Sequence, residues 1–247
     1  MKQYVLIATS LLLGAHPSFG SLVLSSATAS NGTGLGSEPT ILTIQGNGST
    51  ELGCVGSTSA LTGTSFNSTG ICGSGANDVK SGAGQIGPQT LAAGGVTSAS
   101  DFAIVFNANQ TASGPITLTG LTAAFYSPTG NFLYETSGVS CTAVLNNTCT
   151  FPNTFSGTGK AGFVFQLDAA QAAAATAAGA FSNTNNIVGL SASASNVSGG
   201  PETFFLGSTS AQAGPPPSTP EPASLFLTFM GVALVCIGGY RRSSVSK

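Results

Sequence analysis

Short apolar runs separated by turn-forming residues mark the second half of the chain. Residues 102–106 (FAIVF) form a continuous apolar run of the length expected for a buried strand. In residues 161–167, Phe163, Phe165 and Leu167 occupy alternate positions, which is the period of a half-buried strand. Short strands of this kind, bounded by Gly, Pro, Asn and Ser, predict a mainly β fold, an antiparallel β-sandwich.

Residues 118–135 predict a β-hairpin. An apolar run that begins at Ile116 ends at residues 124–126, and residues 131–135 (NFLYE) supply the return strand. Residues 127–131 (SPTGN) place Pro and Gly at positions that suit a turn. Further strands are expected at residues 40–44, 139–145, 186–191 and 203–206.

Residues 21–100 show a weaker strand pattern than the second half of the chain. Gly, Ser, Thr and Asn are dense in residues 21–100, and residues 57–95 predict long loops with one or two short strands. Only residues 40–44 (TILTI) stand out there as a strand.

One helix is predicted between two of the later strands. Asp168 is a favourable N-cap residue, and Gln171 completes a capping-box pattern three positions later. Residues 169–178 are almost entirely Ala, the strongest helix former, and Gly179 is a suitable stop. We therefore expect one Ala-rich crossover helix lying on a sheet.

The amino terminus has the pattern of a secretory signal peptide. Lys2 supplies the positive charge, residues 4–14 are mostly apolar, and Ser18 and Gly20 are small. This predicts a leader helix over residues 1–20 and cleavage between Gly20 and Ser21. The exported domain would then cover residues 21–212, of which 21–100 are loop-rich.

The carboxyl terminus predicts a membrane anchor. A Pro-rich linker, residues 213–222, precedes residues 223–240, which are 18 residues without a formal charge. As a helix they would span about 27 Å, close to the hydrocarbon thickness of a bilayer. Arg241 and Arg242 begin a basic tail, residues 241–247, which is expected to stay on the cytoplasmic side.

This tail resembles a known bacterial sorting signal. The tripeptide Pro220, Glu221 and Pro222, followed by an apolar helix and then by Arg241 and Arg242, is similar to the PEP-CTERM signal of exported bacterial proteins. The resemblance implies that a membrane-embedded processing enzyme, an exosortase, removes the apolar tail. It also implies coupling to extracellular polysaccharide production. The protein would first be an inner-membrane intermediate and would then lie at the cell surface or outside the cell.

The charge pattern narrows the possible partners. Residues 21–219 contain seven carboxylates but only two lysines, Lys80 and Lys160. Two lysines 80 positions apart in the sequence form no basic cluster to meet phosphates, so nucleic-acid binding is disfavoured.

Four of the five cysteines lie in the predicted exported domain, where disulfides are expected. Three pairings are possible. We favour Cys54–Cys72 and Cys141–Cys149, because each pair brackets a local loop rich in Gly, Asn, Ser and Thr. A metal site is the alternative, but no C-x-x-C motif and no histidine partner accompany the cysteines.

No catalytic, metal or cofactor site is predicted. The only histidine, His16, lies in the leader, which removes Ser-His-Asp, Cys-His and His-based metal chemistry from the exported domain. A glycosidase with two carboxylates stays formally open, although the seven acids form no recognisable motif. Asp101 and Asp168 are candidate calcium ligands, but a turn and a helix cap explain them more simply.

Together these patterns predict a sorted, non-catalytic protein of the bacterial envelope or extracellular matrix. The alternative is a carbohydrate-binding or adhesive module built on the loops of the sandwich. Two other membrane attachments stay open: a permanent single-pass anchor and a lipid-anchored surface protein, although the basic tail argues against lipid anchoring.

Overall fold

The protein is described from a computed structural model. The described residues are 21–26, 39–57, 61–63, 65–67, 70–73, 77–80, 87–108, 114–145, 148–151, 162–198 and 200–209. The predicted leader, Pro-rich linker, membrane anchor and basic tail lie outside them, together with Pro220, Glu221, Pro222, Arg241, Arg242 and Gly20. No helix within the described residues is long and apolar enough to cross a bilayer.

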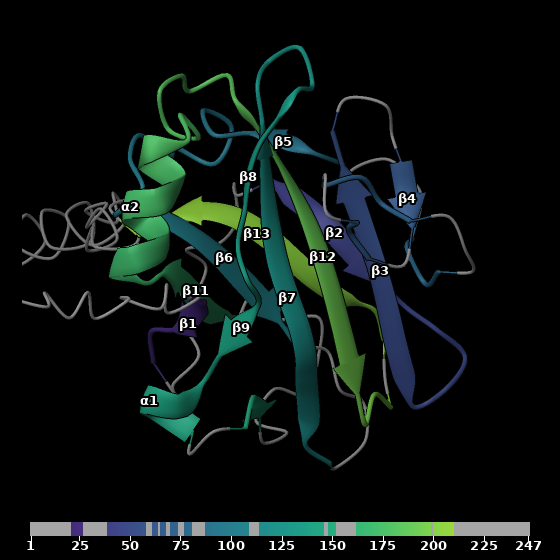
Figure 1. Ribbon diagram of the computed structural model, residues 1–247. Helices are drawn as coiled ribbons and strands as arrows, with labels where there is room; N and C mark the ends of the chain where they lie inside the picture. Colours follow the sequence, from purple (N-terminus) through teal and green to yellow (C-terminus); the bar gives the residue numbers. More distant parts are fainter. Residues whose placement is uncertain are drawn as a thin grey trace, which may run out of the picture. The chain divides into compact units, whose positions relative to one another are not determined.

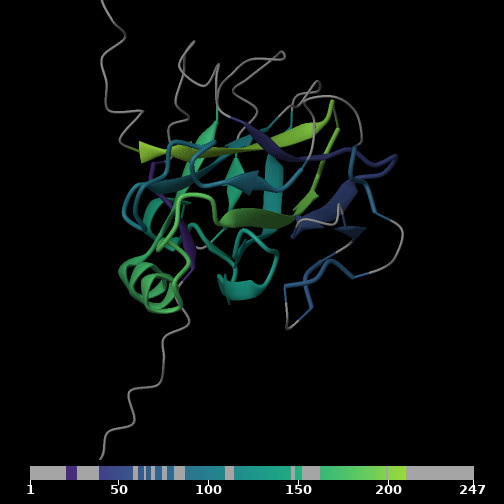
Figure 2. The same ribbon diagram turned by 90° about the horizontal axis from the view of Figure 1, so that it is seen from above.

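The chain is mainly β, and its strands form two sheets that are stacked in layers (Figures 1 and 2). The first sheet has the order β2 (Thr40–Ile44), β13 (Glu202–Ser208), β6 (Phe102–Asn107), β11 (Phe163–Leu167), β1 (Leu22–Leu24), β9 (Val139–Ser140). The second has the order β10 (Thr150–Phe151), β7 (Ile116–Tyr126), β12 (Ile187–Ser195), β3 (Thr50–Gly56), β4 (Leu61–Gly63), with β5 (Gln89–Thr90) on β12 and β8 (Phe132–Glu135) on β7. The pairing is antiparallel except between β1 and β9, so the sandwich prediction is confirmed at the level of architecture.

Phenylalanine side chains fill the space between the sheets. Phe106 of β6 stacks on Phe204 of β13 with ring centroids 5.0 Å apart, and Phe106 also meets Phe151 of the other sheet at 5.6 Å. Elsewhere in the core, Phe181 packs against both Phe102 and Phe125, which belong to different sheets. The apolar runs of the sequence therefore bury their side chains in one shared core.

The predicted hairpin is confirmed. β7 pairs with β8, and the turn is closed by hydrogen bonds from Ser127 N to Asn131 O (2.8 Å) and from Gly130 N to Ser127 O (2.9 Å). Gly130 has a φ of 86°, which a residue with a side chain rarely adopts.

A β-bulge explains the irregular apolar spacing in β7. Leu118 and Leu121 are three residues apart, yet both are buried. Opposite them on β12, the register shifts between Ser193 and Ala194, so β7 carries one extra residue at this point. The bulge returns both leucines to the inner face, which strict alternation would not allow.

Helix α2 (Ala169–Ala177) confirms the predicted helix and its ends. Asp168 caps it by accepting a hydrogen bond from Gln171 N, and Gly179 has a φ of 80°. The bonds from Ala180 N to Ala175 O and from Gly179 N to Thr176 O form a Schellman ending. The sequence led us to expect a helix lying on one sheet. Instead, α2 contacts β11 of the first sheet and β8 of the second, so it lies beside both sheets (Figure 1).

Three sequence predictions need correction. Residues 139–145 are not one strand: only β9 is extended, and α1 (Thr142–Leu145) follows it as a single helical turn. β1 and the seven-residue β3 were not predicted at all. β12 continues to Ser195, beyond the predicted residues 186–191. For β1, β3 and β12 strand pairing decides the outcome: β3, for example, lies against β12, a partner more than 130 positions later in the chain.

Candidate functional site

Two disulfides hold the loops of the sandwich. They join Cys54 to Cys72 and Cys141 to Cys149, with Cα atoms 5.9 Å and 5.2 Å apart. These are the two pairs that the sequence favours. All four cysteines are buried or nearly so. Of the three possible disulfide pairings, the structure has this one.

The Cys54–Cys72 bond attaches a loop to the outer face of the second sheet. Tyr126 points to this face, and its hydroxyl donates a hydrogen bond to Gly70 O. Phe66 from the same loop packs near Tyr126, in a small apolar cluster separate from the main core. Burial, assisted by the negative charge of Glu135, raises the pKa of Tyr126 well above its usual value, so the hydroxyl stays a donor at physiological pH.

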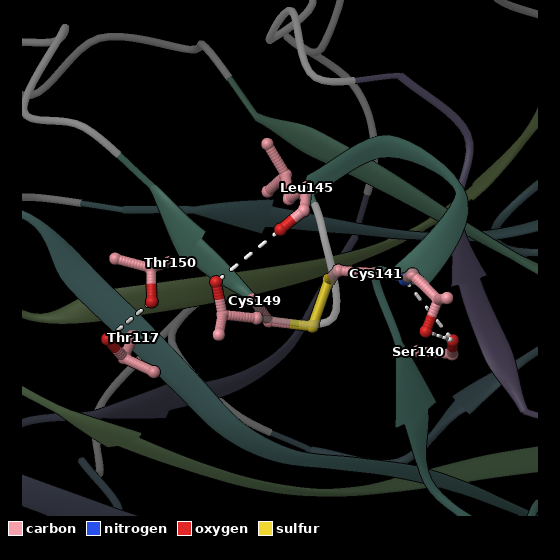
Figure 3. The surroundings of a disulfide bond; sticks show 8 residues. Thr117, Ser140, Cys141, Leu145, Cys149 and Thr150 are labelled. Atoms are coloured by element: carbon pink, nitrogen blue, oxygen red, sulfur yellow. Dashed lines mark hydrogen bonds between the residues drawn. A yellow bond between two sulfur atoms is a disulfide. The ribbon is translucent and has the colours of Figure 1, made fainter.

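The Cys141–Cys149 bond connects the two sheets. Cys141 directly follows β9 of the first sheet, and Cys149 directly precedes β10 of the second (Figure 3). Between them, Leu145 N donates to Cys141 O at 2.7 Å and closes the turn of α1. On the far side, Thr150 and Thr117 share a hydroxyl hydrogen bond of 3.0 Å, which fixes β10 on β7.

A pair of buried carboxyl groups lies between the sheets. Glu51 is the second residue of β3, and Glu202 is the first residue of β13 in the other sheet. Glu51 is 3% exposed and Glu202 is 0% exposed. Because alternate residues of both strands face the core, these two side chains point inward from opposite layers and meet.

The sheets approach each other closely beside this pair. A Cβ atom added to Gly53 would lie 2.4 Å from Cγ2 of Val79 and 3.0 Å from Cγ2 of Ile44. Ile44 is the register partner of Glu202, and Gly53 lies two residues from Glu51 on the same face. Only a residue without a side chain allows this approach.

Residues 77–80 close the adjacent edge. Asp78 N donates to Leu52 O of β3 (2.9 Å), and Lys80 N donates to Thr43 O of β2 (2.9 Å), so this segment is bonded to both sheets. Asp78 also accepts from Leu52 N through its carboxylate at 2.9 Å. These bonds cover the edge at which β2 and β3 would otherwise separate.

Burial of two carboxyl groups side by side favours a proton on Glu202. Oε2 of Glu51 and both carboxyl oxygens of Glu202 have no hydrogen-bond donor among the described residues. Two ionised carboxylates cannot bond to each other, whereas one protonated group donates to its ionised neighbour. Burial, and then the contact with Glu51, raises the pKa of Glu202 to about 10.

This pair cannot act as a glycosidase site. Such enzymes place two carboxyl groups about 5 to 9.5 Å apart on either side of an open cleft. Glu51 and Glu202 are in contact and closed off from solvent, so a sugar ring cannot come between them. The pair therefore lacks the open cleft that a glycosidase needs.

The two candidate calcium ligands have other roles. Asp101 closes the turn before β6 by accepting hydrogen bonds from the backbone and side chains of Thr97 and Ser98. Burial alone would raise the pKa of Asp101, but these hydrogen bonds outweigh it and lower the pKa. Asp168 caps α2. Within the described ranges, no three His, Cys, Asp or Glu side chains are grouped as a metal site would need.

Two large apolar side chains among the described residues are exposed: Phe132, at the start of β8, and Ile71, which follows Gly70, a residue that lies against the Phe132 ring. Ile71 is 46% exposed and Phe132 is 39% exposed. The ring of Phe132 packs on the backbone of Gly70, where an added Cβ would lie 2.5 Å from Cδ2, and Tyr126 meets the ring edge-on at 6.1 Å. We refer to Ile71 and Phe132 as the edge patch.

A shallow depression lies between α2 and the turn before β6. Small side chains line it: Ser98, Ala99, Ser100, Ala172, Ala173, Thr176 and Ala177. This lining contains no charged side chain, and the hydroxyl of Ser98 is used to close the turn by donating to Asp101.

No protein-family profile, curated protein or solved structure matches this chain significantly. Sequence reasoning missed the carboxyl pair, although a signal was present. Glu51 precedes Gly53 and Val55, and Glu202 precedes Phe204 and Leu206, at the two-residue spacing of an inward face.

Proposed function

We propose that this chain is an exported bacterial protein whose β-sandwich is a non-catalytic component of the envelope or extracellular matrix. Residues 1–20 act as a cleaved leader. The signal made of Pro220, Glu221 and Pro222, with the apolar segment and Arg241 and Arg242, holds the precursor in the inner membrane. An exosortase-type enzyme then removes the tail. The sandwich is displayed at the cell surface or released, and we expect extracellular polysaccharide to surround it there.

The two disulfides support this proposal most strongly. Disulfides persist in oxidising compartments and are rare in cytosolic proteins of mesophiles. Here both bonds lie inside the folded sandwich, each closes a local loop, and one links the two sheets. A fold that depends on two such bonds needs to mature outside the cytoplasm.

Replacing Pro220, Glu221 and Pro222 together by Ala should retain the precursor in the membrane. In a bacterium that carries an exosortase-type enzyme, we expect the surface and released forms to fall at least about tenfold, because the processing enzyme loses its recognition tripeptide while the apolar anchor remains. Cell fractionation with detection of the C-terminal peptide measures this.

The matched control replaces Pro215, Pro216 and Pro217 by Ala, upstream of the tripeptide. This change should leave processing intact. If the wild-type chain itself keeps Arg241 and Arg242 at the cell surface, the permanent single-pass anchor is the correct description.

The edge patch supports a second candidate function, carbohydrate binding. Aromatic rings at a sheet edge can stack on sugar faces, and Phe132 is the exposed aromatic of the described residues. Phe132→Ala should then lower the affinity of the exported domain for extracellular polysaccharide about tenfold, while the lost contacts with Gly70 and Tyr126 lower its melting temperature only slightly. A glycan array on which the wild-type protein binds nothing would exclude this candidate.

A further inference from the structure

The first described residue, Ser21, contacts a carboxylate at the start of α2. Ser21 N donates to Oδ2 of Asp168 at 2.6 Å, and Asp168 N donates back to Ser21 O at 3.3 Å. The other carboxylate oxygen, Oδ1, accepts from Gln171 N at 2.8 Å. Asp168 therefore divides its two oxygens between the helix cap and Ser21.

The sheet register determines this meeting. β1 pairs antiparallel with β11, and Leu22 lies opposite Leu167. The preceding residue, Ser21, is therefore opposite the following one, Asp168. Leu22 is completely buried and its N–H donates to Gly138 O at 2.8 Å, so β1 cannot shift along β11 without losing its core contact.

We propose that the Asp168 carboxylate binds the positively charged amino terminus that forms at Ser21 when the leader is removed. This inference rests on the proposed export, and in particular on cleavage between Gly20 and Ser21. Hydrolysis of that peptide bond turns the Ser21 amide nitrogen, already in contact with Oδ2, into an α-ammonium group. A hydrogen bond from a neutral N–H to a carboxylate becomes an ion pair at the same contact.

The surroundings favour the ion pair on balance. The carboxylate already strengthens the bond from the amide N–H, and a positive charge on the nitrogen adds a Coulombic attraction to it. The positive end of α2 opposes a nearby cation, but Asp168 lies between the two and is bonded to both. Tyr134 also faces this end of the helix, where its hydroxyl donates a hydrogen bond to Oε1 of Gln171. Burial, and then the charge of Asp168, raises the pKa of Tyr134, so its hydroxyl stays neutral.

The consequence is that maturation itself fixes the first strand. In the precursor, β1 is held at this end by an amide hydrogen bond. In the processed chain it is held by an ion pair with the same carboxylate, at the outer part of the first sheet. Cleavage one residue earlier or later would move the charge away from Oδ2.

The test uses a chain that begins at Ser21 and is otherwise complete, kept in detergent micelles. Competitive acetylation with mass-spectrometric detection gives the pKa of its α-amine. An ordinary α-amine has a pKa of about 7.7 to 8.0. We expect the Ser21 amine to lie about one unit higher, which makes its acetylation about tenfold slower near neutral pH.

Asp168→Asn is the decisive variant, because Asn caps helices as well as Asp, whereas its amide carries no charge and places an NH2 donor where Oδ2 accepts from Ser21. It should return the α-amine to its ordinary pKa. A chain that starts at Gly20 supplies a second comparison without any change to the fold, and should also show an ordinary α-amine. Equal acetylation rates in all three chains would overturn the proposal.

The native terminus separates this inference from the proposed function. Amino-terminal sequencing of the protein exported by cells shows where the leader is cut. A raised pKa together with a native terminus other than Ser21 would refute the role in maturation. A native Ser21 with an ordinary pKa would refute the ion pair and leave the export proposal standing.

Discussion

Raising the pH from about 6 to about 8 is expected to lower the free energy of unfolding by about 3 kcal/mol, through the Glu51–Glu202 pair alone. An unfolded Glu loses its proton near pH 4.3, roughly, whereas the buried pair keeps one proton to much higher pH. Between these limits the folded state binds more protons, so stability falls by about 1.4 kcal/mol for each pH unit. Urea unfolding at a series of pH values measures this slope.

Glu202→Gln should flatten that slope. Gln has nearly the shape of a protonated Glu and can donate to Glu51, so the variant needs no bound proton to satisfy the pair. We expect it to match the wild type near pH 5, roughly, and to be more stable by several kcal/mol above about pH 8.

Glu135→Gln is the matched control. Its carboxyl has a pKa raised by partial burial without a carboxyl partner, so its contribution should be small. Asp101 affects stability in a different pH range. Because its pKa is lowered in the folded state, the stability it contributes is lost only when the pH falls below about 4. Parallel wild-type and Glu202→Gln curves would show that no proton is shared.

Removing both disulfides is expected to unfold the domain or bring it close to unfolding. Closing loops with sequence separations of 18 and 8 contributes on the order of 3 kcal/mol each by restricting the unfolded chain. The total of about 6 kcal/mol is comparable to the whole stability of many domains, which is about 5 to 15 kcal/mol. Thermal unfolding of the Cys→Ser pair variants, singly and combined, measures these losses.

The two bonds should not be equivalent. Cys54→Ser with Cys72→Ser also releases the loop that buries the hydroxyl of Tyr126, so we expect the larger loss there. Cys141→Ser with Cys149→Ser removes the link between the sheets but leaves the hydroxyl bond of Thr117 and Thr150. Cys236→Ser, in the predicted anchor, is the control and should change nothing. An unchanged melting temperature in the combined variant would contradict a disulfide-dependent fold.

Local patterns predicted the elements that are stabilised locally. The hairpin of β7 and β8 has its own turn, and α2 has its own N-cap and glycine ending, so residues close in sequence carry the information. β3 was missed for the opposite reason. Its inner face carries Glu51 and Gly53 where a strand pattern requires apolar side chains, and β12 supplies its partner.

The carboxyl pair could not be predicted from the sequence because its members are 151 positions apart. Their contact depends on the order of strands in both sheets, which turn chemistry does not determine. The same holds for Ser21 and Asp168, which meet only because β1 pairs with β11. Asp168 was correctly predicted as a helix cap, but its second oxygen has a partner that no local motif indicates.

Export with processing at both ends is the claim on which the proposed function depends, and the intact mass of the native protein tests it most directly. The protein should be recovered without reducing agent from a bacterium with an exosortase-type enzyme. We expect a chain that begins at Ser21, lacks Arg241 and Arg242, and carries both disulfides. A mass that retains both the leader and the basic tail, with all cysteines reduced, would contradict the account.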